Sequence, residues 1–387
     1  MRKYWVLVVA GVAALNASAV APSAATRAAA PANHGSHYLR GPVFTPPTIP
    51  GTFGMVADIV FVDAATNRLY LSDIVNAEVD VWNATTGIYV GAIKAGFAGE
   101  TGFPASVDHV GPLGVLVDDM HQVWAGNGDG TVKVASTRTL QETDSIATGG
   151  VNRADELAYD PKDKLILITN PAEGTDAAPT PYVTLIDARP NHHHVLGHVS
   201  IPGAGLDSVE QPKYDPTTGK FLVSVRQTTA VANGMNGAVA IIDPTSIKLD
   251  AMFGLSQFCS PAGLAIGPDR EAVLGCDSAP PVIINRSNGA ILSTLSEACC
   301  ADEVWYNSAD GRYYVADGGN PDNNNSTDPV VMVIDAKTHR FVTTIPVRDS
   351  QGNPDPRFHV VAAAFDDSHV YIPQFDGVHV WVRADHP

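Results

Sequence analysis

Short apolar strands recur along the chain in groups of three, and each strand ends at a polar residue. The clearest group consists of Asp155–Asp160, Leu165–Asn170 and Tyr182–Asp187. Short apolar runs that are bounded by turn residues are typical of β-strands. A weaker fourth strand follows the third, for instance Ile88–Ile93 and Phe341–Ile345. The pattern predicts four-stranded antiparallel sheets that are repeated along the chain.

The group occurs seven times, which predicts an all-β fold with a single seven-bladed β-propeller. The seven first strands are Asp58–Asp63, Leu113–Asp118, Asp155–Asp160, Glu210–Asp215, Ala262–Gly267, Asp302–Asn307 and Val361–Asp366. The last group stops after its third strand, Val378–Val382. We expect the segment Tyr38–Thr45 to supply the missing strand and close the ring, because closure removes an exposed sheet edge.

The repeat resembles a known propeller family. The segments Tyr159–Asn170 and Val183–Asp187 are similar to the YVTN-type β-propeller repeat, which is related to NHL and gluconolactonase-like propellers. The resemblance covers nearly all of residues 37–387 and implies a propeller fold for them. These propellers include binding proteins, lactonases and lyases, so the resemblance does not imply one particular activity.

The N-terminus has the pattern of an export signal. Arg2 and Lys3 precede the apolar stretch Tyr4–Leu15, and Ala17-Ser18-Ala19 fits a cleavage site. We predict a signal peptide over 1–19, with cleavage as late as 25, and a disordered Ala/Pro-rich linker over 20–36. An uncleaved membrane anchor is the alternative. No other stretch reaches the ~18–20 apolar residues of a membrane helix, so we expect a periplasmic or secreted monomer without membrane insertion after cleavage.

Charge and cysteines narrow the possible partners. The net charge of −17, without a basic run, argues against nucleic acid and favours a cation or a small-molecule ligand. Cys259, Cys276, Cys299 and Cys300 lie close together in the sequence. In an oxidising compartment such a set predicts two disulfides, of which three pairings are possible, and a soft-metal site is the alternative.

Acidic residues recur at the start of the first strands, which line the channel of a propeller. When these strands are aligned on their last residue, four acids share one position: Asp58, Asp155, Glu210 and Asp302. Their oxygens suit a divalent cation, most readily Ca²⁺. The resemblance to gluconolactonase-like propellers also implies a divalent ion on this face, although Asp58 stands where that family has Glu. The acids could instead cap backbone N–H groups or pair with Arg153 and Arg226.

Further candidates surround the same face. We predict His109, His359, Glu156 and Glu303 as proton-transfer residues of a catalytic site. We predict these ligand-binding residues: Arg153, Arg226, Asp73, Asn127, Asn170 and Asp317. Three hypotheses follow: a binding protein for a small ligand or cation, a metal-dependent hydrolase (lactonase-like) or lyase, and a protein-interaction scaffold. No motif indicates a nucleotide or organic cofactor.

Overall fold

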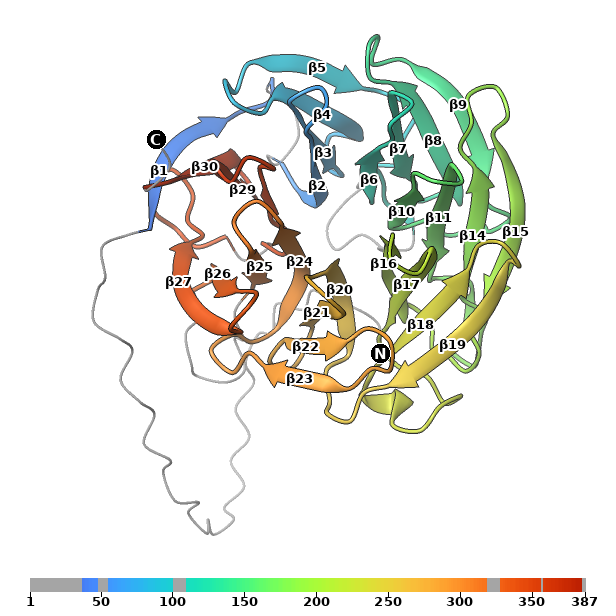
Figure 1. Cartoon of the computed structure of the whole chain (residues 1–387). Coiled ribbons are helices and arrows are strands. Elements are labelled where there is room, and N and C mark those ends of the chain that lie inside the picture. Colours follow the sequence, from blue (N-terminus) through green and yellow to red (C-terminus); the bar gives the residue numbers. More distant parts are fainter. Residues whose placement is uncertain (1–36, 48–54, 100–108, 319–327, 356–357, 385–387) are drawn as a thin grey trace, which may run out of the picture.

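A computed structural model describes residues 37–47, 55–99, 109–318, 328–355 and 358–384. Its strands form seven four-stranded antiparallel sheets arranged as the blades of a ring (Figure 1). This arrangement confirms the predicted all-β, seven-bladed β-propeller. The predicted signal peptide and linker, 1–36, lie outside the described residues. Among the residues that are described, no helix is long and apolar enough to cross a membrane.

The blades follow the chain, and in each the first strand lies innermost. Blade one contains β2 (Ala57–Asp63), β3 (Arg68–Asp73), β4 (Glu78–Asn83) and β5 (Tyr89–Ile93). Blade two contains β6 (Val115–Val117), β7 (Gln122–Gly126), β8 (Thr131–Ser136) and β9 (Glu142–Ala147). Blade three contains β10 (Leu157–Asp160), β11 (Leu165–Asn170), β14 (Tyr182–Asp187) and β15 (His194–Ser200), with the hairpin β12 (Gly174–Thr175) and β13 (Ala178–Pro179) inserted.

The other blades repeat the pattern. Blade four contains β16 (Val209–Asp215), β17 (Lys220–Val225), β18 (Ala238–Asp243) and β19 (Lys248–Gly254), with the 3₁₀ turn η2 (Gly234–Asn236) inserted. Blade five contains β20 (Pro261–Ile266), β21 (Glu271–Cys276), β22 (Val282–Asn285) and β23 (Ile291–Thr294). Blade six contains β24 (Ala301–Asn307), β25 (Arg312–Asp317), β26 (Val330–Asp335) and β27 (Arg340–Pro346). Blade seven contains β28 (Ala362–Ala363), β29 (His369–Gln374) and β30 (Gly377–Arg383), completed by β1 (Tyr38–Phe44).

The ring closes between the two ends of the propeller. Strand β1 pairs antiparallel with β30, from Tyr38 opposite Arg383 to Phe44 opposite Val378. The Tyr38 hydroxyl lies 2.9 Å from the Tyr314 hydroxyl of blade six and accepts a hydrogen bond from Arg312 Nη1 at 2.8 Å. The predicted closing strand is therefore confirmed, and its first residue also ties blade seven to blade six.

Tyr38→Phe tests this link. The substitution keeps the aromatic packing against Tyr314 but removes the hydroxyl that Arg312 and Tyr314 contact. We expect the free energy of unfolding to fall by about 1 kcal/mol, since each net hydrogen bond contributes about that much. Urea denaturation measures the change. Phe44→Leu is the comparison at the other end of β1, where packing alone is altered, and an unchanged midpoint for Tyr38→Phe would show that the hydroxyl contributes nothing to closure.

Neighbouring blades pack through apolar faces, and their first strands surround the axis. Contacts between first strands run in ring order through β2, β6, β10, β16, β20, β24 and β28, and back to β2. One core cluster joins Leu69, Leu71 and Trp82 of blade one to Tyr371 and Val380 of blade seven, and comparable clusters fill the other junctions. Residues at the inner strand ends of several blades are thereby held near one axis.

Two glycines let the acidic blades approach the axis closely. A Cβ at Gly263, just inside β20, would lie 2.9 Å from Glu303 Cα and nearer still to the Asp302 carbonyl oxygen. A Cβ at Gly114 would lie 2.7 Å from Glu156 Cα. Glycine at position 263 in blade five therefore leaves space for the acids of blade six. Glycine at position 114 in blade two leaves space for those of blade three.

Gly263→Ala tests the close approach. The added methyl group meets backbone atoms of β24, which cannot rotate away, so we expect a loss of about 2 kcal/mol of stability from overpacking. Gly311→Ala is the matched control: its φ is +64°, and nothing lies within 4 Å of its Cβ position, so it reports the conformational cost of a side chain alone. Thermal and urea unfolding compare the two. A Gly263→Ala protein as stable as the wild type would show that the blades can separate freely.

Candidate functional site

The start of several first strands carries an irregularity that shapes the site. The pairing register shifts between Ala57 and Val60, between Val209 and Pro212, and between Ala301 and Val304. A β-bulge places an extra residue in one strand and redirects side chains. Consecutive acids can therefore both face the axis, and in β24 Asp302 reaches Arg226 while Glu303 hydrogen-bonds Glu156.

Arg226 joins acids from three blades. It follows β17 and is 8% exposed. Its Nε donates to Glu210 Oε1 at 2.6 Å, its Nη1 contacts Asp277 Oδ2, and its Nη2 lies 3.6 Å from Asp302 Oδ1. Burial lowers the pKa of Arg226, but the carboxylates of Glu210 and Asp302 outweigh burial and keep the pKa raised. Two predicted metal-binding acids, Glu210 and Asp302, are thus salt-bridge partners of a predicted ligand-binding arginine.

Arg153 forms a second ion-pair centre between blades three and four. Its Nη2 lies 3.3 Å from Asp155 Oδ2 and 3.4 Å from Asp207 Oδ1. Burial lowers its pKa, whereas Asp155, Glu210, Asp207 and Asp58 raise it, and the net shift is upward. The four acids predicted from the strand alignment therefore share one electrostatic neighbourhood, since Asp58, Asp155 and Glu210 act on Arg153, and Glu210 and Asp302 act on Arg226.

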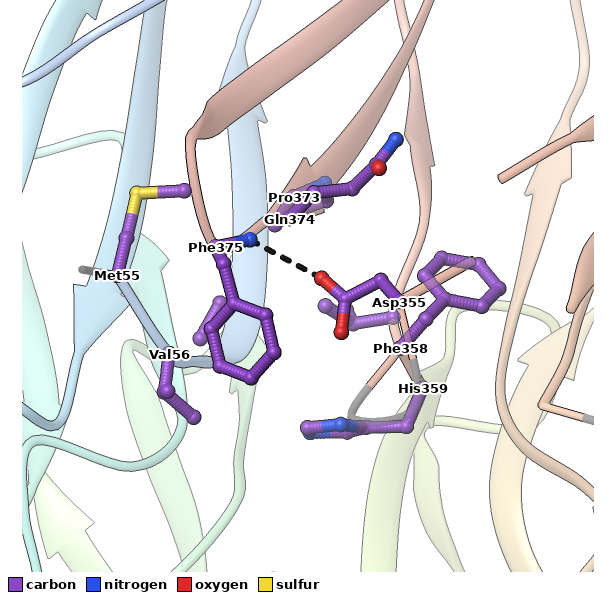
Figure 2. A pocket seen from close by; sticks show the side chains of 10 residues that line it. Met55, Val56, Asp355, Phe358, His359, Pro373, Gln374 and Phe375 are labelled. Carbon is purple, nitrogen blue, oxygen red and sulfur yellow. Dashed lines mark hydrogen bonds between the residues drawn. The ribbon is translucent and has the colours of Figure 1, made fainter. Parts of the chain in front are cut away.

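Asp58 and His359 form a further, partly exposed pair at the site. His359 Nε2 is 4.0 Å from Asp58 Oδ1, and their side chains are 15% and 24% exposed. A small hollow opens beside His359 between blades one and seven (Figure 2). Its lining includes Met55, Val56, Asp355, Phe358 and Phe375. His359, which faces Asp58, lines this hollow, so a small molecule can approach the pair from there.

The axial opening where Arg153 and Arg226 meet their acidic partners is called the mouth. A buried polar cluster lies next to it. Glu156 and Glu303 hydrogen-bond each other, and Gln211 Nε2 donates to Glu303 Oε2. The orientation of Gln211 is fixed because its Oε1 accepts the Leu264 N–H at 2.7 Å. Burial and the charge of Asp302 raise the pKa of Glu303 to about 8, and burial and Glu303 raise the pKa of Glu156. Burial lowers the pKa of the neighbouring Lys213. The two predicted catalytic glutamates can therefore hold a proton at neutral pH.

Several predicted residues make local contacts, within their own blade or with the segment that joins it to the neighbouring blade. Asn127 accepts the Ala98 N–H and donates to Asp129, and Asn170 bonds Thr148 and Thr184, so both amides are used in local packing. His109 lies on the loop before β6, with Nδ1 3.4 Å from the Gly128 carbonyl oxygen. Asp317 accepts the Cys299 N–H at 3.1 Å. Asn127, Asn170, His109 and Asp317 therefore make contacts other than the ion pairs of Arg153 and Arg226.

Asp73 belongs to a different cluster, inside blade one. It accepts hydrogen bonds from the backbone and side chain of Asn76, and burial raises its pKa to about 6. Asp80 and Glu78 lie on the next strand and are also buried. Asp80 accepts the Tyr89 hydroxyl at 2.6 Å, yet burial raises its pKa to about 8, with Asp73 and Glu78 adding to the shift. Asp73 is therefore part of a buried acid group of the blade rather than of the mouth.

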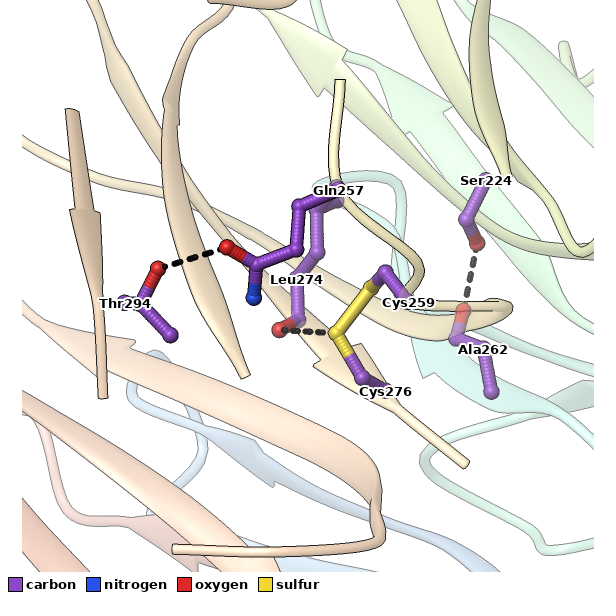
Figure 3. The surroundings of a disulfide bond; sticks show 7 residues. All are labelled: Ser224, Gln257, Cys259, Ala262, Leu274, Cys276 and Thr294. Atoms are coloured by element: carbon purple, nitrogen blue, oxygen red, sulfur yellow. Dashed lines mark hydrogen bonds between the residues drawn. A yellow bond between two sulfur atoms is a disulfide. The ribbon is translucent and has the colours of Figure 1, made fainter. Parts of the chain in front are cut away.

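The cysteines support the mouth on blades five and six. Cys259 and Cys276 form a disulfide with a Cα–Cα distance of 4.7 Å, and Cys276 directly precedes Asp277 (Figure 3). Cys299 and Cys300 form the other pair, two residues before Asp302. The Cys259–Cys276 disulfide is confirmed, and the pairing seen here is the one of the three that joins the adjacent cysteines.

Most of the predicted metal-binding acids pair with arginines. Three of the four predicted metal-binding residues, Asp155, Glu210 and Asp302, direct oxygens at arginines. Over the described ranges, no group of three or more His, Cys, Asp or Glu side chains is placed to hold a metal ion. The expected Ca²⁺ site therefore stays a prediction, and in the described residues these three acids are engaged with arginines.

Four contributors were absent from the predicted site: Asp207, Asp277, Gln211 and Lys213. Asp207 lies in a loop that the strand alignment does not include. Gln211 occupies the position of Glu156 and Glu303 in the alignment, and Lys213 follows two residues later on the same strand face. Glu156, Gln211 and Glu303 each directly follow an aligned acid, so treating that next position as a second set of site residues would have identified Gln211.

Comparisons with known proteins give the fold. No protein-family model matches the sequence, and no curated protein matches it. A chain in the crystal structure of a mitotic checkpoint complex superimposes with a TM-score of 0.61 and 16% sequence identity, over 95% of this chain and 99% of that chain. At this identity the likeness shows the fold alone. The fold and the site together define a seven-bladed β-propeller with an acidic, arginine-bridged mouth at its axis.

Proposed function

We propose that this chain is an exported binding propeller that takes a small organic cation at the mouth of its channel. The observation that carries the proposal is the excess of carboxylates at one opening. Asp58, Asp155, Glu210, Asp302, Asp207 and Asp277 gather around only two arginines, Arg153 and Arg226. A low-dielectric opening lined by one sign of charge concentrates ligands of the opposite sign.

The position of Asp58 favours a small ligand over a protein surface. Asp58 is partly exposed and lies 4.0 Å from His359, which lines the hollow of Figure 2, so a compact ammonium or amidinium group can approach it from that side. The arginine-bridged acids add long-range attraction but have their oxygens engaged. A hydrogen-bonding cation therefore suits the mouth better than a metal ion that must displace these contacts.

Isothermal titration calorimetry of the protein without residues 1–19 tests the proposal. Putrescine is the probe, with Ca²⁺ and succinate as comparison ligands. We expect putrescine to bind, Asp58→Asn to weaken it about tenfold, and succinate not to bind. Asp163→Asn is the matched control, since Asp163 is an exposed acid in the turn between β10 and β11, away from the axis.

The outcomes separate the alternatives. Equal affinity in Asp58→Asn and the wild type, or no binding of any cation, overturns the proposal. Tight Ca²⁺ binding that Asp58→Asn abolishes would favour the metal hypothesis instead. Turnover of a lactone that stops with Asp58→Asn would favour a hydrolase. If no small molecule binds or reacts, the protein-interaction scaffold is the remaining hypothesis. A structural neighbour that comes from a protein complex is in line with it.

Export is part of the proposal and has its own test. The signal-like residues 1–19 and the pairing of all four cysteines support an oxidising compartment. When the full-length gene is expressed with its N-terminus intact, we expect the mature chain in the periplasm or medium, beginning just after Ala19 or as late as residue 26. Intact-mass measurement and N-terminal sequencing read the cleavage point. A chain that keeps Met1 in the cytoplasm contradicts export.

A further inference from the structure

We propose that the Cys299–Cys300 disulfide is a redox control for the mouth, and that its reduction releases Asp302 from Arg226 and weakens cation binding. The weakening of cation binding rests on the proposed function, whereas the release of Asp302 on reduction does not. The two disulfides differ in access. Cys259 and Cys276 are fully buried, whereas Cys299 and Cys300 are partly exposed. A thiol reagent in solution therefore reaches the adjacent pair first.

The adjacent pair holds the backbone that leads into β24. Cys299 N–H donates to Asp317 Oδ2 at 3.1 Å, and Cys300 N–H donates to the Ala279 carbonyl oxygen at 3.3 Å. The first contact ties the segment to the end of β25, and the second ties it to blade five. Asp302 follows two residues later and faces Arg226 Nη2 at 3.6 Å. The position of the Asp302 carboxylate therefore depends on a short segment that the disulfide constrains.

The backbone at Cys300 is in a conformation that the intact bridge helps to maintain. Its φ is +64°, in the left-handed region, which is unfavourable for a non-glycine residue. The S–S bond closes a small ring that includes the peptide between the two cysteines, so the backbone cannot relax while the bond exists. Once the bond is cleaved, Cys300 can leave this region, and its N–H then no longer points at Ala279.

The chemical step is a thiol–disulfide exchange with a dithiol. A thiolate of the dithiol attacks one sulfur of the Cys299–Cys300 bond, forming a mixed disulfide and releasing the other cysteine as a thiol. The second thiol of the reagent then displaces the remaining cysteine. Two electrons and two protons pass from the dithiol to the protein, which ends with two thiols while the reagent becomes a cyclic disulfide.

Release of Asp302 changes the charge arrangement at the mouth. Arg226 would keep Glu210 and Asp277 but lose its blade-six partner, and the ring of acids around the opening would lose one fixed member. We expect cation affinity to fall about tenfold in the reduced protein, comparable to the loss of one well-placed charge contact.

The experiment treats the mature protein with dithiothreitol under native conditions. Alkylation and peptide mass spectrometry should find Cys299 and Cys300 modified while Cys259 and Cys276 stay joined. Hydrogen exchange should rise in the peptide that spans 299–305 and stay constant in blade three. Putrescine titration should show the tenfold loss, and reoxidation should restore binding. The double variant C299A/C300A should have the hydrogen exchange and putrescine affinity of the reduced protein, and dithiothreitol should change neither.

Each result decides between the two proposals. Unchanged exchange over 299–305 after complete reduction overturns the redox control, as does a pair that dithiothreitol leaves intact. Equal putrescine affinity in the two redox states overturns it as well. If exchange rises on reduction but neither state binds putrescine, the release of this segment is supported and the cation-binding function alone is wrong.

Discussion

Arg226→Met is expected to destabilise the protein by about 3–5 kcal/mol, because it leaves buried carboxylates without their counter-charge. Glu210 is 3% exposed and accepts the Arg226 Nε hydrogen bond, while Asp277 and Asp302 meet the two terminal nitrogens from other blades. Methionine has a similar length but supplies no donor. The loss should be larger at pH 8 than at pH 5, since protonation of the abandoned acids relieves part of the cost. Urea denaturation at both pH values measures it.

A double substitution identifies the cause. Arg226→Met with Glu210→Gln removes the most buried of the abandoned charges, so it should recover a substantial part of the stability and reduce the difference between pH 5 and pH 8. The coupling between the two changes gives the pair interaction directly. If the double variant is as unstable as the sum of the two single variants, the loss comes from packing of the arginine stem and not from unpaired charge.

The fold was predictable because its determinants are local and repeated. Most first strands end in a polar turn residue, as Asp63, Asp160 and Asp215 do, and every further repeat supports the same blade pattern. Closure followed from a missing fourth strand, and β1 fills that place with Tyr38 opposite Arg383. Both features can be read from the sequence, because the repeat depends on short-range patterns and the closing strand on an unpaired sheet edge.

The grouping of the four aligned acids was predictable, but their ion pairs were not. The alignment brought Asp58, Asp155, Glu210 and Asp302 to one opening because strand ends in a ring share one face. Pairing with Arg153 and Arg226 was one of the alternatives for these acids, but the alignment did not choose between it and a cation site, because the reach of an arginine across blades depends on loop paths. Asp207 shows the same limit, because it enters from a loop outside the repeat.

The polar residues that follow the second strands differ in whether they reach the shared site, and the reason is related. Asn127 and Asn170 bond within their own surroundings, whereas Arg226 has a side chain long enough to cross from blade four to blades five and six. Position alone therefore marks a candidate, and side-chain length decides whether it reaches a shared site. Asp73, at the same position in blade one, remains inside its blade.

Asp80→Asn is expected to make the protein more stable than the wild type at alkaline pH. Asp80 is fully buried, and its pKa is raised from 3.8 to about 8, mainly by burial. Between these values the folded protein holds a proton that the unfolded chain has released, so the wild-type free energy of unfolding falls as pH rises through this window. The slope from one such group is about 1.4 kcal/mol per pH unit. Asparagine is neutral throughout and still accepts the Tyr89 hydroxyl.

The measurement is the stability difference between Asp80→Asn and the wild type, from urea unfolding at several pH values between 4 and 9. The difference should grow in favour of the variant up to about pH 8 and stay constant above it, because both the folded and unfolded wild-type chains are then ionised at this position. Asp163→Asn, at an exposed turn, should show no such trend. A difference that is independent of pH would mean that Asp80 is already ionised in the folded protein and that Tyr89, with Lys94 nearby, compensates its charge within the blade.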